Sequence, residues 1–440
     1  MEKKLKKLNV AEGQYKIISN YFNKNEFVEE SNQVIYGLIN DVAGKNIMQK
    51  IKSDGLDKMH LYFSVDYVPF LEAALKKKFN ETMYKQIFYV GKNNLFLNKK
   101  NVFYIDKGIN YRIIYPFRVS VKSRLKRKVY RLLNLENFLN PETEILNAQK
   151  NKNKYKLTKA DINKLRYFKN LPYPSCGHGP HRDTWFGHTF DSLNLWWSIA
   201  GVNTKTGMTI YPDVNNHELD HIPDPSYVLP NQYLGKPKTI GLKDGNLLIF
   251  DPEILHGTKL NTSNQTRIVF SGRINRIKPS FYNRKGAPEF AHWLLSEDVE
   301  KDQFNKTHYF FRKDNSIVKP KRQKLNKSKY LEIKINKKFK NQLRFKLIKK
   351  TALNKKKFYK IKFKNIILCM FFLKNDVRVF NIKCPHLQID LSDGYFNKNH
   401  VICPGHQLTF NLRNGKSTCN NFKIKLYKVK IENNYLFLYT

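Results

Sequence analysis

The chain has 440 residues, a formal net charge of +44, and 41% hydrophobic and 14% aromatic residues. This length exceeds what one core usually holds and the apolar content is ample for real cores, so we expect two or more globular domains. The charge comes mostly from lysines spread along the whole chain beside abundant asparagine, isoleucine and phenylalanine, a pattern that an A- and T-rich coding sequence also produces. We therefore do not expect nucleic acid to be a partner, although so high a charge ordinarily suggests it.

The cysteines and the apolar runs indicate the compartment. Five cysteines are too few and too unevenly placed for a disulfide framework, and Cys369 and Cys419 are expected to be buried small hydrophobic residues. The N-terminus is basic but lacks the apolar core of a signal peptide. The longest apolar run, Ile366 to Leu373, is far too short to span a bilayer. The expected location is the reducing cytoplasm, without a membrane span.

The N-terminal part reads as mixed helix and strand. Apolar side chains recur at helical spacing over 20–38 and 68–85, whereas residues within 102–117 alternate as they do in strands. The densest basic cluster follows at 121–131, and such a run is usually a solvated helix face. If this cluster binds a ligand, the simplest ligand is an anionic group of the substrate. A further helix is predicted over 155–170.

Two residues of a metal site lie in the next segment, C-G-H-G-P-H-R-D-T-W at 176–185. One residue separates His181 from Asp183, so on an extended backbone both side chains point the same way. His178 and His188 lie nearby without this spacing, and we assign them supporting or structural roles. The pair supplies half of a metal site.

The missing ligand is expected far along the chain, because a three-ligand site with open positions needs a histidine from another strand. His256 is the best candidate, since it follows the strand-like run at 245–250 and a turn, and Arg267 lies on the next strand-like run. Two histidines and one carboxylate are the ligand set of mononuclear non-haem Fe(II) oxygenases. An arginine beside such a site is suited to clamp a carboxylate through two charge-assisted hydrogen bonds.

Together these residues resemble a known family. The order H-x-D, H-G-T and a following arginine, with G-M-T-I-Y-P-D at 207–213 and L-K-D-G-N-L-L-I-F-D-P at 242–252, is similar to the Fe(II)/2-oxoglutarate-dependent oxygenases of the phytanoyl-CoA dioxygenase-like family. The resemblance implies a double-stranded β-helix (cupin or jelly-roll) barrel over 156–285. It also implies that the helical and mixed segment 1–155 packs around this barrel and shapes the substrate pocket, within one domain 1–285.

The resemblance also implies roles for single residues. His181, Asp183 and His256 are expected to hold Fe(II), and Arg267, with Thr258, to bind the far carboxylate of the co-substrate 2-oxoglutarate. Related halogenases leave the position of Asp183 small so that chloride can bind iron. A carboxylate at this position therefore implies hydroxylation or desaturation.

The pentapeptide H-E-L-D-H at 217–221 matches the H-E-x-x-H pattern of zinc proteases, in which two histidines one helical turn apart bind zinc. That site requires a helix of several turns, but Pro212, Pro223 and Pro225 lie close on both sides. We predict instead that this segment is a loop between barrel strands. In place of a zinc site, the loop could form part of a lid over the iron.

The character of the chain changes after the barrel. One helix is expected over 286–300, and the charged run at 320–329 has little apolar content and predicts a linker. We assign 286–329 to this helix and basic linker. A second domain is expected to begin near Tyr330.

The second domain carries two short motifs that hold metal-ligand residues. Cys384 and His386 stand in C-P-H, and Cys403 and His406 stand in C-P-G-H. Two thiolates and two imidazoles on facing loops are the ligands of a [2Fe–2S] cluster with Cys on one iron and His on the other. A zinc site uses the same residue types, but zinc-finger spacing keeps the cysteines together and the histidines together, which this chain does not do.

These motifs resemble a Rieske ferredoxin-type domain, a small all-β domain that covers 330–440. L-S-D-G at 391–394 and expected closing strands at 427–431 and 435–439 are also similar to the Rieske pattern. Gly405 departs from it, because an aromatic residue is common at this position, and its small size should expose the second loop. Neither loop holds the extra cysteine of the respiratory versions, which implies the lower-potential, ferredoxin-like kind.

The two domains together predict a non-haem iron dioxygenase that hydroxylates or desaturates a small organic substrate with O2 and 2-oxoglutarate. The cluster is expected to supply electrons or to return the iron to Fe(II), with a ferredoxin or flavin reductase as its donor. Three alternatives stay open: a Rieske-driven iron oxygenase that does not use 2-oxoglutarate, a non-catalytic Rieske electron carrier or redox sensor, and an oxygenase that acts on nucleic acid.

Overall fold

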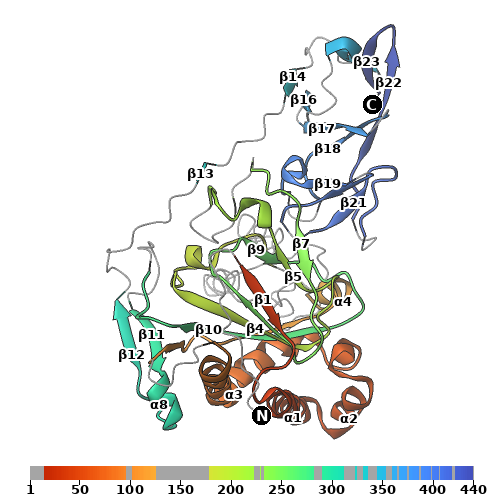
Figure 1. The fold of residues 1–440 in the computed structure, drawn as a ribbon. Coiled ribbons are helices and arrows are strands. Elements are labelled where there is room, and N and C mark those ends of the chain that lie inside the picture. Colours follow the sequence, from red (N-terminus) through yellow and green to blue (C-terminus); the bar gives the residue numbers. More distant parts are fainter. Residues whose placement is uncertain are drawn as a thin grey trace, which may run out of the picture.

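The computed structural model has an N-terminal part, in which helices pack against β-sheets, and a C-terminal part made of strands (Figure 1). The predicted helix over 155–170 lies outside the described residues, as do His386, His406 and Cys419. The residues that the structure describes are 14–95, 102–124, 178–221, 228, 232–281, 290–311, 323–324, 331–334, 344–352, 359–363, 366–373, 376–385, 388–397, 399–405, 407–418 and 422–439.

An eight-stranded sheet forms the centre of the N-terminal part. Its strands are β1 (Tyr15–Ile18), β2 (Tyr104–Asp106), β3 (Asn110–Ile114), β4 (Ser192–Ala200), β8 (Leu247–Phe250), β10 (Arg267–Asn275), β11 (Phe290–Leu295) and β12 (His308–Phe311). They are ordered β1-β8-β4-β10-β2-β11-β12, with β3 also paired to β10. The strands within 102–117 are thereby confirmed as β2 and β3. The long strands β4 and β10 run antiparallel at the centre and are buried along nearly their whole length.

A three-stranded sheet covers one face of the main sheet. It consists of β5 (Met208–Ile210), β7 (Lys238–Ile240) and β9 (His256–Thr258), in the order β7-β5-β9. Trp196 and Val269 of the main sheet form one apolar cluster with Met208 and Ile210 of this second sheet. The expected mainly β fold, with facing sheets in the barrel region, is confirmed.

Helices cover the other face of the main sheet (Figure 1). The expected helices over 20–38 and 68–85 are confirmed as α1 (Lys24–Ala43) and α3 (Val68–Val90), joined through α2 (Lys45–Asp54). Phe27 of α1 packs on Trp197 and Phe79 of α3 packs on Phe270, each with ring centroids 5.7 Å apart. Because successive strand residues face opposite ways, Trp196 and Trp197 serve the two different cores.

Shorter elements connect these layers, and one of them contains the start of the basic cluster. They are η1 (Leu56–Leu61), η2 (Val65–Tyr67), η3 (Gly91–Leu95), α4 (Phe117–Arg124), η4 (Asp183–Phe186), η5 (Pro212–Val214), β6 (His217–Glu218), α8 (Ser296–Glu300) and β13 (Gln323–Lys324). Helix α4 contains the first four residues of the basic run at 121–131, and the rest of the run lies outside the described residues.

The single helix predicted over 286–300 is wrong. Residues 290–295 form the strand β11, and only 296–300 form the helix α8. Strand β11 pairs with β2 on one side and with β12 on the other, so partners far away in the sequence decide its conformation. Ala291 and Trp293 are buried whereas His292 between them is exposed, which is the alternation of a strand.

Replacing Trp293 by alanine is expected to lower the free energy of unfolding by about 3–5 kcal/mol, the usual cost of removing a buried aromatic side chain. Trp293 is 1% exposed and packs with Phe281 and Ala291. Denaturant unfolding followed by circular dichroism measures the effect. The control is His292→Ala on the outer face of the same strand, which should change stability by no more than about 0.5 kcal/mol. Equal losses in the two variants would contradict the assigned face of β11.

The C-terminal part consists of two further sheets. The larger has the order β14-β16-β17-β18-β22-β23-β15, and the smaller the order β19-β20-β21. The expected closing strands at 427–431 and 435–439 are confirmed as β22 and β23. The elements are β14 (Leu331–Lys334), β15 (Arg344–Lys349), η6 (Lys350–Ala352), β16 (Tyr359–Phe363), β17 (Ile366–Leu373), β18 (Asp376–Asn381), η7 (Leu391–Asp393), β19 (Tyr395–Asn397), β20 (His400–Ile402), β21 (Thr409–Asn411), β22 (Leu426–Glu432) and β23 (Tyr435–Tyr439).

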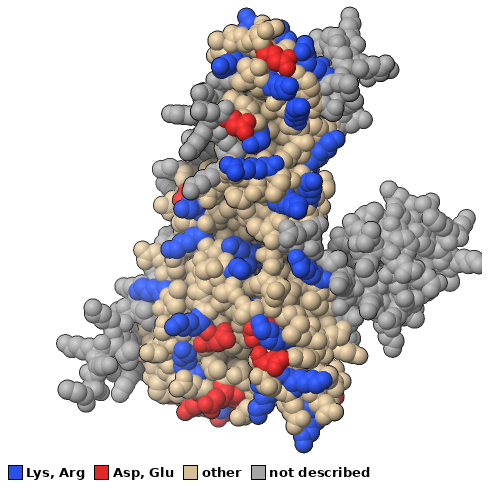
Figure 2. Space-filling view, turned by 90° about the vertical axis from the view of Figure 1, so that its right-hand side faces the viewer, with Lys and Arg blue, Asp and Glu red and all other residues tan. Residues whose placement is uncertain are grey.

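The charge on one face of the molecule is dispersed. Figure 2 shows Lys and Arg side chains scattered over the whole visible face, with acidic side chains among them, rather than gathered into one patch. Within the described ranges, no helix combines the length and the apolar composition that crossing a bilayer requires.

Candidate metal centre

Three predicted ligands meet where the two sheets of the N-terminal part face each other. His256 is the first residue of β9, and it exchanges two backbone hydrogen bonds with His181, of 2.8 and 2.9 Å. Asp183 begins the 3-10 turn η4, and its backbone N–H donates to the carbonyl of Pro252. The donor atoms of His181, Asp183 and His256 all lie within 4.8 Å of one another, and all three side chains are largely buried.

Hydrogen bonds to the backbone orient both imidazoles. Nδ1 of His181 lies 2.7 Å from the carbonyl oxygen of Gly179, and Nδ1 of His256 lies 2.9 Å from that of Ile254. A carbonyl oxygen only accepts, so Nδ1 of each ring carries the proton and donates it, which leaves the lone pair of Nε2 free for a metal. Each Nε2 atom is 3.5 Å from Oδ1 of Asp183, so the three donors surround one point.

The protonation states also suit a metal ion. Burial, with a smaller contribution from His181, lowers the pKa of His256 to about 4, so this imidazole is neutral at neutral pH. Burial alone raises the pKa of Asp183, but Arg273 and the neighbouring imidazoles outweigh it and hold the pKa well below its usual value. The carboxylate is therefore ionised. These residues fit Fe(II), which takes two imidazoles and a carboxylate in an open three-ligand site.

Arg273 is a residue of the candidate site that our sequence reasoning missed. Its Nη2 and Nε atoms lie 2.9 and 3.3 Å from Oδ2 of Asp183, and its Nη1 lies 3.5 Å from Oδ2 of Asp106. One carboxylate oxygen of Asp183 thus faces the histidines while the other is held by the guanidinium. A signal was present, because Arg267 and Arg273 are an even number of residues apart on one predicted strand and must point to the same face.

Replacing Arg273 by methionine is expected to weaken Fe(II) binding about 10–100-fold, the usual cost of losing the partner that orients a metal ligand. Without the guanidinium, burial raises the pKa of Asp183, so the loss should grow as the pH falls from about 8 to about 6. Anaerobic Fe(II) titration at both pH values measures this. The exposed Arg276→Met is the matched control. Wild-type affinity at the lower pH in Arg273→Met would refute the role.

A cavity of about 340 Å3 opens beside these ligands, with Arg267 and Thr258 in its wall. Arg267 is 1% exposed, and its Nη1 donates to the carbonyl of Thr206 at 2.5 Å. Among the described residues its Nε has no hydrogen-bond partner and no carboxylate pairs with it. Burial, helped by the nearby charge of Arg112, lowers the pKa of Arg267 to about 9. A buried cation without a counter-charge favours an anionic ligand.

Two other polar groups face the same cavity. Thr258 accepts a hydrogen bond at 2.8 Å from the backbone N–H of His178, so the proton of its own hydroxyl remains available for donation. Asn194 of β4 is 4% exposed, and within the described part of the chain neither its Oδ1 nor its Nδ2 has a partner. Our sequence reasoning did not single out Asn194, because an asparagine on a buried strand has no distinctive spacing.

The remaining histidines near the site do not join the ligand cluster. His178 and His188 line the cavity, but their nitrogen atoms are not grouped with those of the three ligands. The H-E-L-D-H segment forms no helix, as expected, since His217 and Glu218 make the short strand β6. Arg182 secures this segment by donating to the carbonyl of His217 at 3.0 Å. A zinc-protease site is thereby ruled out.

The two predicted cluster loops have the same backbone design. The N–H of Cys384 donates to Ile389, and the N–H of Gln388 donates back to Cys384. The second loop repeats these bonds between Cys403, Leu408 and Gln407, and both glutamines have a φ of 59°. Two loops that match in this way present two thiols in equivalent positions.

The surroundings of the thiols suit a cluster. Cys384 and Cys403 are 1% and 2% exposed, neither is in a disulfide, and both belong to one apolar cluster. The predicted exposure of the second loop at Gly405 is wrong. Gly405 is buried, and a Cβ atom there would come within 2.2 Å of the Ile389 side chain, so the close packing of the two loops explains the glycine.

Comparisons with known proteins match two families to two different parts of the chain. Residues 122–269 match the family described as Phytanoyl-CoA dioxygenase (PhyH), and residues 344–428 match the family described as Rieske [2Fe-2S] domain. The first match contains His181, Asp183, His256, Thr258 and Arg267, and the second contains both cysteine and histidine pairs.

Curated relatives match only the C-terminal part. The chain is 33% identical over 67 residues to the ferredoxin component of the 2,4-dinitrotoluene dioxygenase system of Burkholderia sp. (strain RASC). It is 34% identical over 68 residues to the ferredoxin component of the naphthalene 1,2-dioxygenase system of Pseudomonas putida. These matches cover 15% of the chain and 64% and 65% of the relatives, less than two thirds of their length. Among solved structures, the Sphingomonas yanoikuyae B1 ferredoxin matches with 23% identity and a TM-score of 0.20, over 23% of this chain and 99% of that chain.

Proposed function

We propose that this chain, in which a phytanoyl-CoA dioxygenase region is joined to a Rieske [2Fe–2S] domain, is an Fe(II)- and 2-oxoglutarate-dependent oxygenase. Its substrate is a small organic molecule, which it hydroxylates or desaturates. The observation that carries the proposal is one cavity lined both by three side chains able to hold a metal ion and by a buried arginine that has no counter-charge among the described residues.

Each residue has a definite task in this proposal. His181, Asp183 and His256 hold Fe(II) and leave its remaining positions open. The iron, when bound, supplies the activation of oxygen. Arg267 and the hydroxyl of Thr258 bind the distal carboxylate of 2-oxoglutarate, and the buried walls keep bulk water away from the reaction. In hydroxylation, O2, 2-oxoglutarate and substrate give carbon dioxide, succinate and hydroxylated product, so one oxygen atom enters succinate and the other enters the product.

Replacing Arg267 by methionine tests this proposal by binding alone. The affinity for 2-oxoglutarate, measured calorimetrically in the anaerobic Fe(II)-loaded protein, should fall about 100-fold, because a buried carboxylate loses its charged partner. Arg276→Met, which removes an exposed arginine near the end of the same strand, should bind as the wild type does. Unchanged affinity in Arg267→Met would remove 2-oxoglutarate from the proposal.

A second candidate is an iron oxygenase that is driven by the Rieske cluster and does not use 2-oxoglutarate. The relatives of the C-terminal part favour it, because they are named as ferredoxin components of dioxygenase systems. In both candidates the cluster delivers electrons, either for the reaction or to return the iron to Fe(II), and a ferredoxin or flavin reductase is its donor. The buried charge of Arg267, which pairs with no carboxylate in the described part of the chain, favours the first candidate, since a site that takes all its electrons from a cluster has no need of a dicarboxylate clamp.

A further inference from the structure

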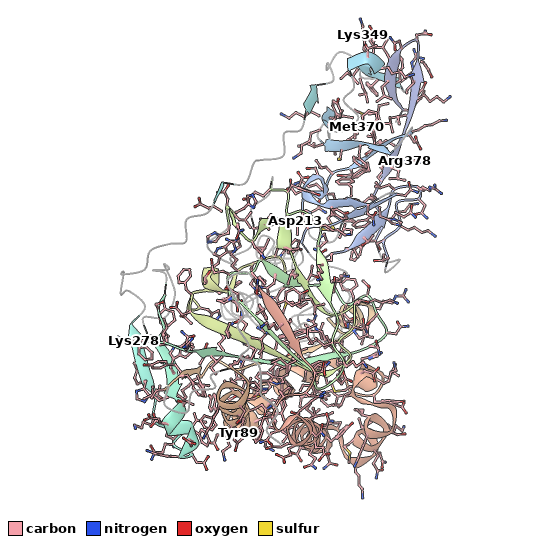
Figure 3. The ribbon with its side chains drawn as sticks, in the orientation of Figure 1. Tyr89, Asp213, Lys278, Lys349, Met370 and Arg378 are labelled. Atoms are coloured by element: carbon pink, nitrogen blue, oxygen red, sulfur yellow. The ribbon has the colours of Figure 1, made fainter. Side chains whose placement is uncertain are left out.

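We infer that Tyr211 is a positioning residue that fixes the second cluster loop against the strand of His256, so that electrons pass between the two metal centres within one chain. The inference rests on the proposed iron site and on the Rieske cluster, but not on the use of 2-oxoglutarate. It depends on contacts at the end of the barrel that faces the C-terminal sheets. Figure 3 labels Asp213 at this end, two residues beyond Tyr211, with Met370 and Arg378 of the C-terminal sheets farther along.

The backbone of Tyr211 is tied to the iron site. Ile210 at the end of β5 is paired with His256 of β9. The next residue, Tyr211, donates its backbone N–H to the carbonyl of Leu255 at 3.0 Å. Leu255 immediately precedes His256, so Tyr211 is one hydrogen bond and one peptide unit away from a metal ligand.

The side chain of Tyr211 is tied to the second cluster loop. Its hydroxyl donates to the carbonyl oxygen of Pro404 at 3.2 Å and accepts a hydrogen bond from Nε2 of Gln407. Pro404 follows the predicted ligand Cys403. Tyr211 is 2% exposed, and burial raises the pKa of its phenol far above the usual value, so the hydroxyl keeps the proton that it donates. One buried tyrosine therefore bridges two loops that each bear a ligand.

Apolar contacts hold the two parts together beside this bridge. Phe117 and Leu260 of the N-terminal part belong to the same buried cluster as Cys384 and Cys403. The ring of Phe117 also contacts that of Phe422, with centroids 5.4 Å apart. The contact between the parts thus combines a buried apolar region with a hydrogen-bonded bridge, which is how specific interfaces are built.

The redox step that this contact serves is balanced. With both groups bound, the reduced cluster would give up one electron and become oxidised, and ferric iron held by His181, Asp183 and His256 would gain that electron and become ferrous. No bond forms or breaks, and no proton moves. An external one-electron donor of the flavoprotein or ferredoxin class then reduces the cluster again. One path of covalent and hydrogen bonds runs from Cys403 through Pro404, the Tyr211 hydroxyl and backbone, and Leu255 to His256.

Tyr211→Phe removes both hydrogen bonds and keeps the ring. In the holoprotein with zinc in the barrel and an oxidised cluster, hydrogen–deuterium exchange over residues 403–408 should become about tenfold faster, as expected for two lost buried hydrogen bonds. The second measurement uses the iron-loaded protein, reduced anaerobically with dithionite and mixed with O2 in the absence of 2-oxoglutarate. The iron-dependent rate of cluster reoxidation should fall by about the same factor. The zinc-loaded protein measures the direct reaction of the cluster with O2, and the substitution should leave that rate unchanged.

Tyr84→Phe is the matched control, because it removes a buried hydroxyl that donates to the carbonyl of Lys107 at 3.1 Å within the N-terminal part. It should behave as the wild type in both measurements. An unchanged iron-dependent rate in Tyr211→Phe would overturn the inference. The two proposals fail separately. Absence of succinate formation in the wild-type protein speaks only against the use of 2-oxoglutarate. An unchanged rate of cluster reoxidation in Tyr211→Phe speaks only against the role of Tyr211.

Discussion

Replacing Asp183 by alanine is expected to abolish both tight Fe(II) binding and oxygen-dependent turnover. The substitution removes one of the three proposed ligands, and among the described acidic residues it leaves buried Arg273 with only the more distant Asp106 as a partner. Loss of one member of a buried ion pair costs about 3–5 kcal/mol, so the free energy of unfolding should fall as well. Iron content after anaerobic reconstitution, product formation and denaturant unfolding measure the three effects.

Glu218→Ala is the control for this substitution. Glu218 is exposed on β6 and is the residue that a zinc protease would use as its base. Because the segment forms a strand rather than a helix, this variant should keep wild-type iron content and activity. Hydroxylation retained by Asp183→Ala would remove Asp183 from the ligand set.

Replacing Cys384 by serine is expected to abolish the Rieske cluster, because a cluster needs all four of its ligands. The visible and EPR signals of the cluster should disappear, while Fe(II) binding in the barrel should persist. If the cluster restores Fe(II), activity in the variant should decay within a few turnovers, and an added chemical reductant should rescue it. Unchanged multiple-turnover activity without any reductant would exclude the cluster from electron supply.

Cys369→Ala is the control for the loss of a thiol. Cys369 is fully buried in the same apolar cluster, and burial raises the pKa of its thiol far above the usual value, so it is an inert core residue, as predicted. The control should retain the cluster and its signals. Loss of the cluster in Cys369→Ala would mean that the apolar packing, and not ligation, explains the result for Cys384→Ser.

The grouping of His181, Asp183 and His256 could be predicted because it depends largely on local geometry. One intervening residue on an extended backbone places His181 and Asp183 on one side, and the structure keeps Arg182 extended before the turn at Asp183 begins. His256 and Arg267 could be found because each stands on or beside a strand-like run. The two motifs that contain Cys384 and Cys403 could also be recognised, because each is a short stretch of sequence. Their two loops share one pattern of backbone hydrogen bonds.

The remaining features depend on contacts between distant segments. Phe290–Leu295 has apolar residues that fit a helix as well as a strand, and only its pairing with β2 and β12 decides between them. Tyr211 gains its position from residues about two hundred places farther along the chain, as its contacts with Pro404 and Gln407 show. No periodicity in a sequence reports such a contact, because it results from the docking of one part on the other.

The most direct test of the central claim is anaerobic reconstitution with Fe(II), followed by addition of O2 with and without 2-oxoglutarate. Succinate and the visible and EPR spectra of the cluster are recorded together. We predict succinate only when 2-oxoglutarate is present, and its loss in Arg267→Met. Absence of succinate, with a cluster that is still reduced and reoxidised, would contradict the claim and would identify the Rieske domain as the source of electrons for the reaction.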